Sequence, residues 1–375
     1  MSKNIKFNIP YYGNKEYKNI KNFLDKNQDF KELAIKHIQK VTNATAVLLS
    51  SGATSAMDAF FTGADLPKRS EVIMPSFTFP SAANVVIRAG LKPVFAEIDI
   101  KTLVMDIDDV IEKITPNTSC VMPVHYGGVS MDMDALSIAL DGKNICIFED
   151  SALAYGGFYK NRHLGTIGAA GVISFHSTKN ISADGGGAFL INNPDDMEMF
   201  SDILANRTDK QAFIRGDVSE YTWQRAGAGA EMSGLTEALL YSQLEKGNEI
   251  ITGRKLLWNR YMSCLKSTKI EEFAALPLIP SYNTNNYHVF YLMFKQASMR
   301  EYVRNVLINE GIQAHIHYKP LHSSVMGKKL GYRESDLPVT QKASDCILRL
   351  PMHMHLDLAD VEYVCEKLLA AVNDA

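Results

Sequence analysis

The sequence lacks a surplus of basic charge and any pairing of its cysteines, and each absence excludes a class of protein. Its 39 Lys and Arg residues are outnumbered by 42 Asp and Glu residues, which gives a formal net charge of −3. A nucleic-acid-binding protein normally carries a basic surplus, so we expect no nucleic-acid partner. The five cysteines are widely scattered without a CxxC pair. This spacing favours reduced thiols in a cytoplasm and argues against a disulfide framework or a metal site.

Long apolar runs are also missing. No run approaches the roughly 20 residues that a helix needs to cross a bilayer, and the N-terminal segment MSKNIKFNIPYYGNKEY has no apolar core of signal-peptide length. We therefore expect a cytoplasmic protein with no membrane partner. Hydrophobic residues make up 46% and charged residues 22% of the 375 residues, as in ordinary globular proteins. A chain of this length is longer than a single hydrophobic core usually accommodates, which predicts two domains.

Short β-rich apolar segments alternate with amphipathic helical patterns between residue 30 and about residue 200. This alternation predicts an α/β fold with a mostly parallel seven-stranded sheet covered by helices on both faces. The connection between the last two segments has no clear helix, so one strand there could run antiparallel. The expected strands are 46–50, 71–76, 92–99, 119–126, 145–150, 170–176 and 187–192.

The pattern changes from Ser233 onward. Residues 233–265 read as one long helical segment, although two glycines within it weaken that reading. A strand at 287–294 and helices at 299–310 and 359–372 then predict a smaller α+β C-terminal domain. We place the large domain at residues 1–245 and the small one at 246–375.

Polar residues stand where several of the expected strands end, which is the edge at which open α/β sheets bind ligands. Asp150 closes the apolar segment ICIFED, and Lys179 follows the segment AGVISFH. The small residues SSGATS, which run from Ser50 into the next helix, offer backbone N–H groups and hydroxyls to an anion. If the two strands are close in the sheet, an amine and a carboxylate face one cleft with an anion site. Pyridoxal phosphate (PLP) needs this trio for its aldehyde, its ring nitrogen and its phosphate.

Each of these features also has a plainer interpretation. The SSGATS segment and Asp150 could simply cap helices, Phe79 could be a packed aromatic, and a lone His125 indicates little by itself. Glycine runs from Gly165 and Gly227 superficially match a dinucleotide-binding loop. Neither run follows the first strand of a βαβ unit, so an NAD enzyme is not expected.

Several segments, in order and over nearly the whole chain, resemble the PLP-dependent sugar aminotransferases of fold type I known as the DegT/StrS group. Within that group the chain is most similar to the dTDP-4-amino-4,6-dideoxygalactose transaminases, which share an SFHxTKN segment and an RGxVxxYTW segment. The matching segments are SSGATSA, EVIMPSFTFPSAANVVIRAG, PVHYGGVSMDMDAL, FEDSALAYGG, GTIGAAGVISFHSTKN, RGDVSEYTW, EMSGLTEALLYSQLE and IHYKPLH.

The resemblance implies roles for individual residues. Lys179 would be the Schiff-base lysine and proton carrier, and Asp150 would pair with the pyridine nitrogen. Phe79 would stack on the ring, and the family is dimeric with shared active sites. The remaining implied cofactor contacts, all to the phosphate, are Ala53, Thr54, Ser55 and Ser174. The candidate substrate contacts are His125, Arg215, Tyr221, Trp223, His317, Tyr318 and His322.

The chain departs from the family pattern at three places. Leu153 stands where the family usually has a glutamine that contacts the cofactor's 3-oxygen. The glycine segment after Lys179 reads DGGG from Asp184 and is one residue shorter than usual. Gly229 stands where many members have an asparagine that reaches the other subunit's phosphate, and the closest subgroup also lacks that asparagine.

The function implied by the resemblance is transfer of the amino group of L-glutamate to a nucleotide-linked, dTDP-type 4-keto-6-deoxy sugar in surface polysaccharide (lipopolysaccharide O-antigen) biosynthesis. A 3-keto-sugar aminotransferase and a PLP-dependent sugar dehydratase of the same fold are alternatives. The dehydratase branch has histidine in place of the lysine, so Lys179 argues against it. A non-catalytic regulator that binds PLP or a nucleotide sugar is the alternative outside enzymes.

Overall fold

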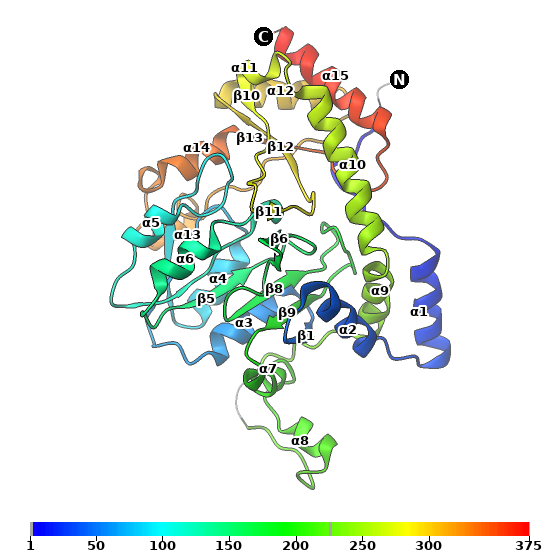
Figure 1. Ribbon diagram of the computed structural model, residues 1–375, viewed down its shortest axis with the longest axis vertical. Helices are drawn as coiled ribbons and strands as arrows, with labels where there is room; N and C mark the ends of the chain where they lie inside the picture. The colour runs from blue at the N-terminus through cyan, green and yellow to red at the C-terminus, as the bar shows by residue number, and fades with distance from the viewer. Residues whose placement is uncertain (1–2, 225–226, 375) are drawn as a thin grey trace.

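The computed structural model of the chain describes residues 3–224 and 227–374. All seven expected strands join one sheet in its centre (Figure 1). They are β1 (Ala46–Ser50), β2 (Glu71–Pro75), β3 (Lys92–Ala96), β4 (Thr118–Val121), β5 (Cys146–Asp150), β8 (Ala170–Ser174) and β9 (Gly187–Ile191). The strand order is β1-β9-β8-β5-β4-β2-β3, and only β9 runs antiparallel to both of its neighbours. The predicted fold class is therefore confirmed, including the antiparallel strand.

Side chains alternate between the two faces of this sheet, as the pleat requires. Val72 and Met74 pack on one face, whereas Ile73 between them packs on the other. Helices cover both faces, which explains why these strands are apolar throughout. The first face carries α3 (Ala53–Gly63), α4 (Pro80–Arg88) and α7 (Met197–Leu204). The second carries α2 (Lys31–Thr42), α5 (Ile107–Glu112), α6 (Met133–Leu140) and α9 (Gly234–Leu244).

The long helical segment expected from Ser233 is interrupted at residues 245–246. It forms α9 and then α10 (Gly247–Leu265), which carries the chain toward a second, smaller sheet (Figure 1). That sheet has the antiparallel order β10-β12-β13 and shares a core with helices α12, α14 and α15. Its elements are β10 (Ala274–Ala275), β12 (Phe290–Phe294), β13 (Ile347–Leu350), α12 (Ala297–Asn309), α14 (Pro338–Cys346) and α15 (Leu358–Asn373). The domain boundary at 245/246 falls at this interruption and stays a prediction.

A small third sheet, in the order β11-β6-β7, joins residues that are far apart in the sequence. Its strands are β6 (Phe158–Tyr159), β7 (Arg162–His163) and β11 (Asn283–Thr284). The remaining helices are α1 (Asn14–Lys26), α8 (Lys210–Arg215), α11 (Ile270–Phe273) and α13 (Val325–Lys329). Helix α8 projects away from the rest of the chain at the bottom of Figure 1. None of the helices in the described residues is long and apolar enough to pass through a membrane.

The N-terminal segment, residues 3–8, lies against the C-terminal part of the chain and not against the large sheet. Ile5 forms a β-bridge with Ile312, and the Phe7 N–H donates to the side chain of Gln313 at 3.0 Å. The segment also lies at the start of α15, where Lys3 pairs with Asp360 at 2.8 Å, while the C-terminus lies at the other end of that helix (Figure 1). No local pattern in the sequence indicated this pairing.

Candidate active site

The sheet brings Asp150 and Lys179 together. Strand β5 ends at Asp150, and its neighbour β8 runs parallel to it, with Asp150 opposite Val172. After β8 the chain turns, with the Lys179 N–H donating to the carbonyl of His176 at 2.8 Å. The side-chain amine of Lys179 makes no hydrogen bond or ion pair with the described residues, and the Asp150 carboxylate accepts only the N–H of Ala152, at 3.1 Å. Both charged groups are thus left available to a ligand.

Burial dominates the ionisation of this pair. Desolvation lowers the pKa of Lys179 to about 8, against the opposing effect of Asp150, and the charge of Arg349 lowers it further. Desolvation likewise raises the pKa of Asp150, while the Ala152 N–H and the Lys179 amine favour its ionised form. The two groups therefore act on one another through space without forming an ion pair. A buried carboxylate and a buried amine without direct partners are costly, and such pairs cluster at functional sites.

The N-terminus of α3 lies at the same edge of the sheet. No side chain caps α3 in the described residues, and the first N–H groups of a helix have no partner within the helix itself. The hydroxyls of Ser51 and Ser55 are 3.0 Å apart beside them. Gly187 supports this end, since a Cβ there would lie 2.4 Å from the Ala53 nitrogen. These groups form an anion site of the kind expected for a phosphate.

The other two expected cofactor contacts are accessible. Ser174 ends β8, and its hydroxyl accepts only a long hydrogen bond, 3.4 Å, from the His176 N–H. Phe79 caps the start of α4 and is 59% exposed, which is unusual for a large aromatic ring. Its ring centre is 6.4 Å from that of Tyr318. An exposed ring at the strand edge is available to cover a flat ligand.

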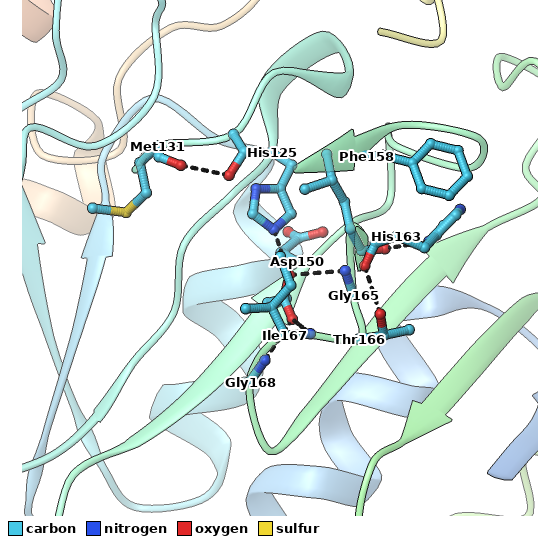
Figure 2. A network of polar contacts seen from close by, with 12 residues as sticks. His125, Met131, Asp150, Phe158, His163, Gly165, Thr166, Ile167 and Gly168 are labelled. Atoms are coloured by element: carbon cyan, nitrogen blue, oxygen red, sulfur yellow. Dashed lines mark hydrogen bonds and ion pairs between the residues drawn. The ribbon is translucent and has the colours of Figure 1, made fainter. Parts of the chain in front are cut away.

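The structure assigns a structural role to Glu149, which the sequence did not single out. This carboxylate is fully buried, accepts a hydrogen bond of 2.8 Å with His125 Nε2, and has its pKa lowered by His125 and by backbone N–H donors against a large desolvation effect. The network fixes the end of β5 next to Asp150 (Figure 2). The backbone donors to Glu149 are Gly165, Ile167 and Gly168, at 2.6–2.8 Å.

Two of the expected substrate contacts are held inside the protein. His125 is completely buried and bound to Glu149. His322 is also completely buried, with its Nδ1 2.8 Å from the Ser76 hydroxyl and its Nε2 near the Glu334 carbonyl. Both side chains make buried hydrogen bonds that brace the site, and their contact with a substrate stays a prediction.

His317 and Tyr318 do reach the site. They line a small cavity of about 40 Å³ together with Lys179. Their rings are stacked, with centroids 4.9 Å apart. Burial, followed by the charge of Arg349, lowers the pKa of His317 to about 3, so its ring is neutral.

The other three expected substrate contacts lie elsewhere within the same chain. Arg215 belongs to the projecting α8 and pairs with Glu198 and Asp217 on the surface. Tyr221 and Trp223 follow it and are 51% and 77% exposed. None of the three lines the cavities beside Lys179 in the described chain. Their role in substrate binding stays a prediction that would need a second subunit.

Sequence reasoning missed two arginines of the cavity. Arg254 from α10 and Arg349 from β13 line it together with Leu153, one of the residues that depart from the family pattern. Neither arginine lies in a motif or at the end of a large-sheet strand, so only tertiary structure brings them there. The described residues contain no cluster of three or more His, Cys, Asp or Glu side chains that could hold a metal ion.

Comparison with known proteins agrees with this geometry. A 30% identical relative is a "pleiotropic regulatory protein" of Geobacillus stearothermophilus, matched over 302 residues that make up 80% of this chain and 77% of the relative. The sugar aminotransferase Spr1654 of Streptococcus pneumoniae in its PMP form has a TM-score of 0.92 at 22% identity, covering 99% of this chain and 98% of that one. The same protein also has a PLP form. DesI, solved with its TDP-sugar product, has a TM-score of 0.88 at 24% identity, covering 100% and 94%.

The model of one protein family covers residues 17–369, which is almost the whole chain. Its description, an aminotransferase family, agrees with the free amine and carboxylate at the ends of β8 and β5. The chain therefore belongs to the DegT/DnrJ/EryC1/StrS aminotransferase family.

Proposed function

We propose that this protein transfers the amino group of L-glutamate to a nucleotide-linked 4-keto-6-deoxy sugar, with dTDP as the nucleotide. Pyridoxal phosphate is the cofactor of its family. The observation that carries the proposal is the pair of buried groups Asp150, at the end of β5, and Lys179, in the turn after the neighbouring β8, neither of which forms an ion pair in the described residues. The free N–H groups of α3 beside them match the third requirement of the cofactor, a site for its phosphate.

The residues fit this cofactor. The Asp150 carboxyl, whose pKa is raised by burial, gains a partner from a protonated ring nitrogen. The N–H groups of Ala53 and Thr54, with the Ser55 and Ser174 hydroxyls, would bind the phosphate. The exposed ring of Phe79 would cover one face of the cofactor.

When bound, the cofactor supplies an aldehyde for the amine and a ring that accepts the electron pair left on the substrate carbon. Lys179 can attack a carbonyl near neutral pH, because its pKa of about 8 leaves part of the amine uncharged. Once released from the cofactor, the same amine can carry a proton from one carbon to the other. Asp150 would hold a proton on the ring nitrogen of the bound cofactor.

The first test is spectroscopic. Purified wild-type protein should take up PLP and show an absorbance band that borohydride removes. Lys179→Ala should lack the band and lose at least about a thousandfold in turnover, since it removes both nucleophile and proton carrier. A wild-type protein that takes up no PLP would refute the proposed function.

The substrate and donor require a second test. We expect incubation with L-glutamate and dTDP-4-keto-6-deoxyglucose to give 2-oxoglutarate and a C4-amino sugar, identified by NMR. Amination at C3 of the matching 3-keto sugar would instead indicate a 3-keto-sugar aminotransferase. Loss of a hydroxyl without 2-oxoglutarate would indicate a dehydratase, which the lysine at position 179 disfavours.

A regulatory role is the second candidate function, and two observations favour it. The Geobacillus relative carries the name of a regulatory protein, and Leu153 replaces a cofactor contact of the family. Conversion of the bound cofactor to its amine form by L-glutamate in a single turnover would exclude a purely binding role. Failure of that half-reaction in a PLP-loaded protein would favour the regulator.

We further propose that the protein works as a homodimer in the cytoplasm, in the biosynthesis of a surface polysaccharide. Exposed aromatic and aliphatic side chains on and after α8 suit contact with a second copy. All five cysteines lie in the described residues and are free thiols, as expected in a reducing compartment.

A further inference from the structure

Two buried arginines beside Lys179 have no acidic partner in the described residues. Arg254 is 4% exposed and Arg349 is 6% exposed. The guanidinium of Arg254 donates only to the carbonyls of Tyr287 and His288, at 3.0 and 2.6 Å. Arg349 contacts the Nδ1 atom of His317, and its own Nε is buried without any hydrogen-bond partner. A buried cation is costly unless an anion compensates it, and the described residues supply none here.

The two arginines and Lys179 line the same cavity of about 40 Å³, and none of the residues around it is acidic. The histidines there add no charge, because burial holds the pKa of both His288 and His317 far below its usual range. Arg349 donates to His317 Nδ1, so the neutral His317 ring carries its proton on Nε2 and offers one more donor. The cavity is positive and small, which suits a single anionic group.

Arg349 is fixed in place from several sides. Its backbone exchanges two hydrogen bonds with His315, at 2.8 and 3.1 Å. Its guanidinium lies over the ring of Phe7, 5.1 Å from the ring centre, where the N-terminal segment crosses the C-terminal part. A guanidinium fixed in this way, with a free Nε, is prepared for a carboxylate, which binds arginine through two parallel hydrogen bonds.

We propose that Arg349, supported by Arg254, binds the α-carboxylate of the amino-acid donor. This inference rests on the proposed aminotransferase function. In an amino acid the α-carboxylate is bonded to the same carbon as the nitrogen that is transferred. A carboxylate site next to Lys179 therefore places that carbon at the reacting amine. The cofactor phosphate has its own donors at α3, so it does not compete for this cavity.

Calorimetry with glutarate, a dicarboxylate that has no amino group to react, tests the site without turnover. Titrations use the wild type, Arg349→Gln and Arg349→Lys, each with and without PLP. Arg349→Gln should raise the dissociation constant about ten- to a hundredfold, since a charge-assisted hydrogen bond is lost. Arg349→Lys should lie between it and the wild type. Arg260→Gln is the matched control, because Arg260 is on the exposed side of α10 and pairs with Glu362.

A second readout identifies which carboxylate is bound. Wild type should convert its cofactor to the amine form much faster with L-glutamate than with L-isoglutamine, in which the α-carboxylate is an amide. Arg349→Gln should lose this discrimination while keeping the PLP absorbance band.

The inference is overturned if Arg349→Gln retains wild-type glutarate affinity or keeps the preference for L-glutamate. Displacement of glutarate by equimolar pyrophosphate would also overturn it, because the cavity would then be a general anion site. A wild type that takes up no PLP would refute only the proposed function. The glutarate titrations without PLP would still decide whether the carboxylate site exists. If Arg349→Gln does not fold, the Arg349→Lys variant is compared with Arg260→Gln.

Discussion

At the scale of single residues, the environment of Lys179 sets the pH at which its amine can react. Burial lowers its pKa from the ordinary 10.5 to about 8, with Asp150 opposing and Arg349 reinforcing this shift. Only the uncharged amine attacks a carbonyl. The rate of covalent PLP uptake by cofactor-free protein should therefore rise with pH and level off above about 8, as stopped-flow absorbance can measure. Asp150→Asn should move the midpoint lower, and a midpoint near 10.5 would contradict the buried position of the amine.

The buried carboxylate of Glu149, next to Asp150, is predicted to have a structural role. It is fully buried and accepts hydrogen bonds from His125 and three backbone N–H groups. In Glu149→Gln an amide NH₂ would meet N–H donors, so the free energy of unfolding should fall by about 3 kcal/mol or more. Urea denaturation measures this change. Glu32→Gln, at an exposed surface pair with Lys36, is the control and should change stability by less than about 0.5 kcal/mol.

Residue types at strand ends predicted Lys179 and Asp150 because their signal is local: a charged group closes an apolar segment. The same logic does not decide the roles of His125 and His322, since a histidine in the sequence does not reveal whether its partner is a ligand or a buried group such as Glu149. The glycine run from Gly165 is explained only by structure. Its N–H groups bind Glu149, and a Cβ at Gly168 would lie 2.4 Å from the Ile147 carbonyl oxygen.

At the scale of elements, strand β9 supports the start of helix α3, and this contact can be tested with two neighbouring glycines. A Cβ on Gly187 would lie 2.4 Å from the Ala53 nitrogen, whereas one on Gly185 would meet nothing within 4 Å. Gly187→Ala should displace the free N–H groups of α3. We expect the PLP affinity to fall about tenfold or more and the free energy of unfolding to fall by about 1–3 kcal/mol. Fluorescence titration and urea denaturation measure both, and Gly185→Ala should match the wild type. Equal behaviour of the two variants would refute the phosphate role of α3.

The elements of the large sheet were predictable because their hydrophobic pattern is local and continuous. Even the antiparallel β9 was foreseeable, since no helix connects it to β8. The small sheets were not, because β11 pairs with β6 across more than a hundred residues and each strand has only two residues. The break between α9 and α10 was suggested by glycine but not located, as helix propensity does not reveal where packing changes direction.

At the scale of the whole molecule, the projecting α8 leads us to predict where two copies meet. Phe213 and Ile214 on this helix are 42% and 63% exposed. The wild type should sediment at about twice the chain mass of 41.7 kDa. Replacing both residues by serine should weaken the dimer at least about tenfold, because exposed apolar area is normally buried in such an interface. Ile138→Ser, at an exposed isoleucine of α6, is the control. A monomeric wild type would refute the prediction.

The pairing of residues 3–8 with the C-terminal part has a consequence for biosynthesis. Ile5 contacts Ile312 and the Phe7 ring lies beneath Arg349, so the residues that leave the ribosome early bind partners translated more than three hundred codons later. The seven large-sheet strands are all translated by residue 191 and can assemble while synthesis continues. The cavity around Arg349 must wait until translation is nearly complete, so a truncated chain can have the large sheet yet lack the arginine beside Lys179.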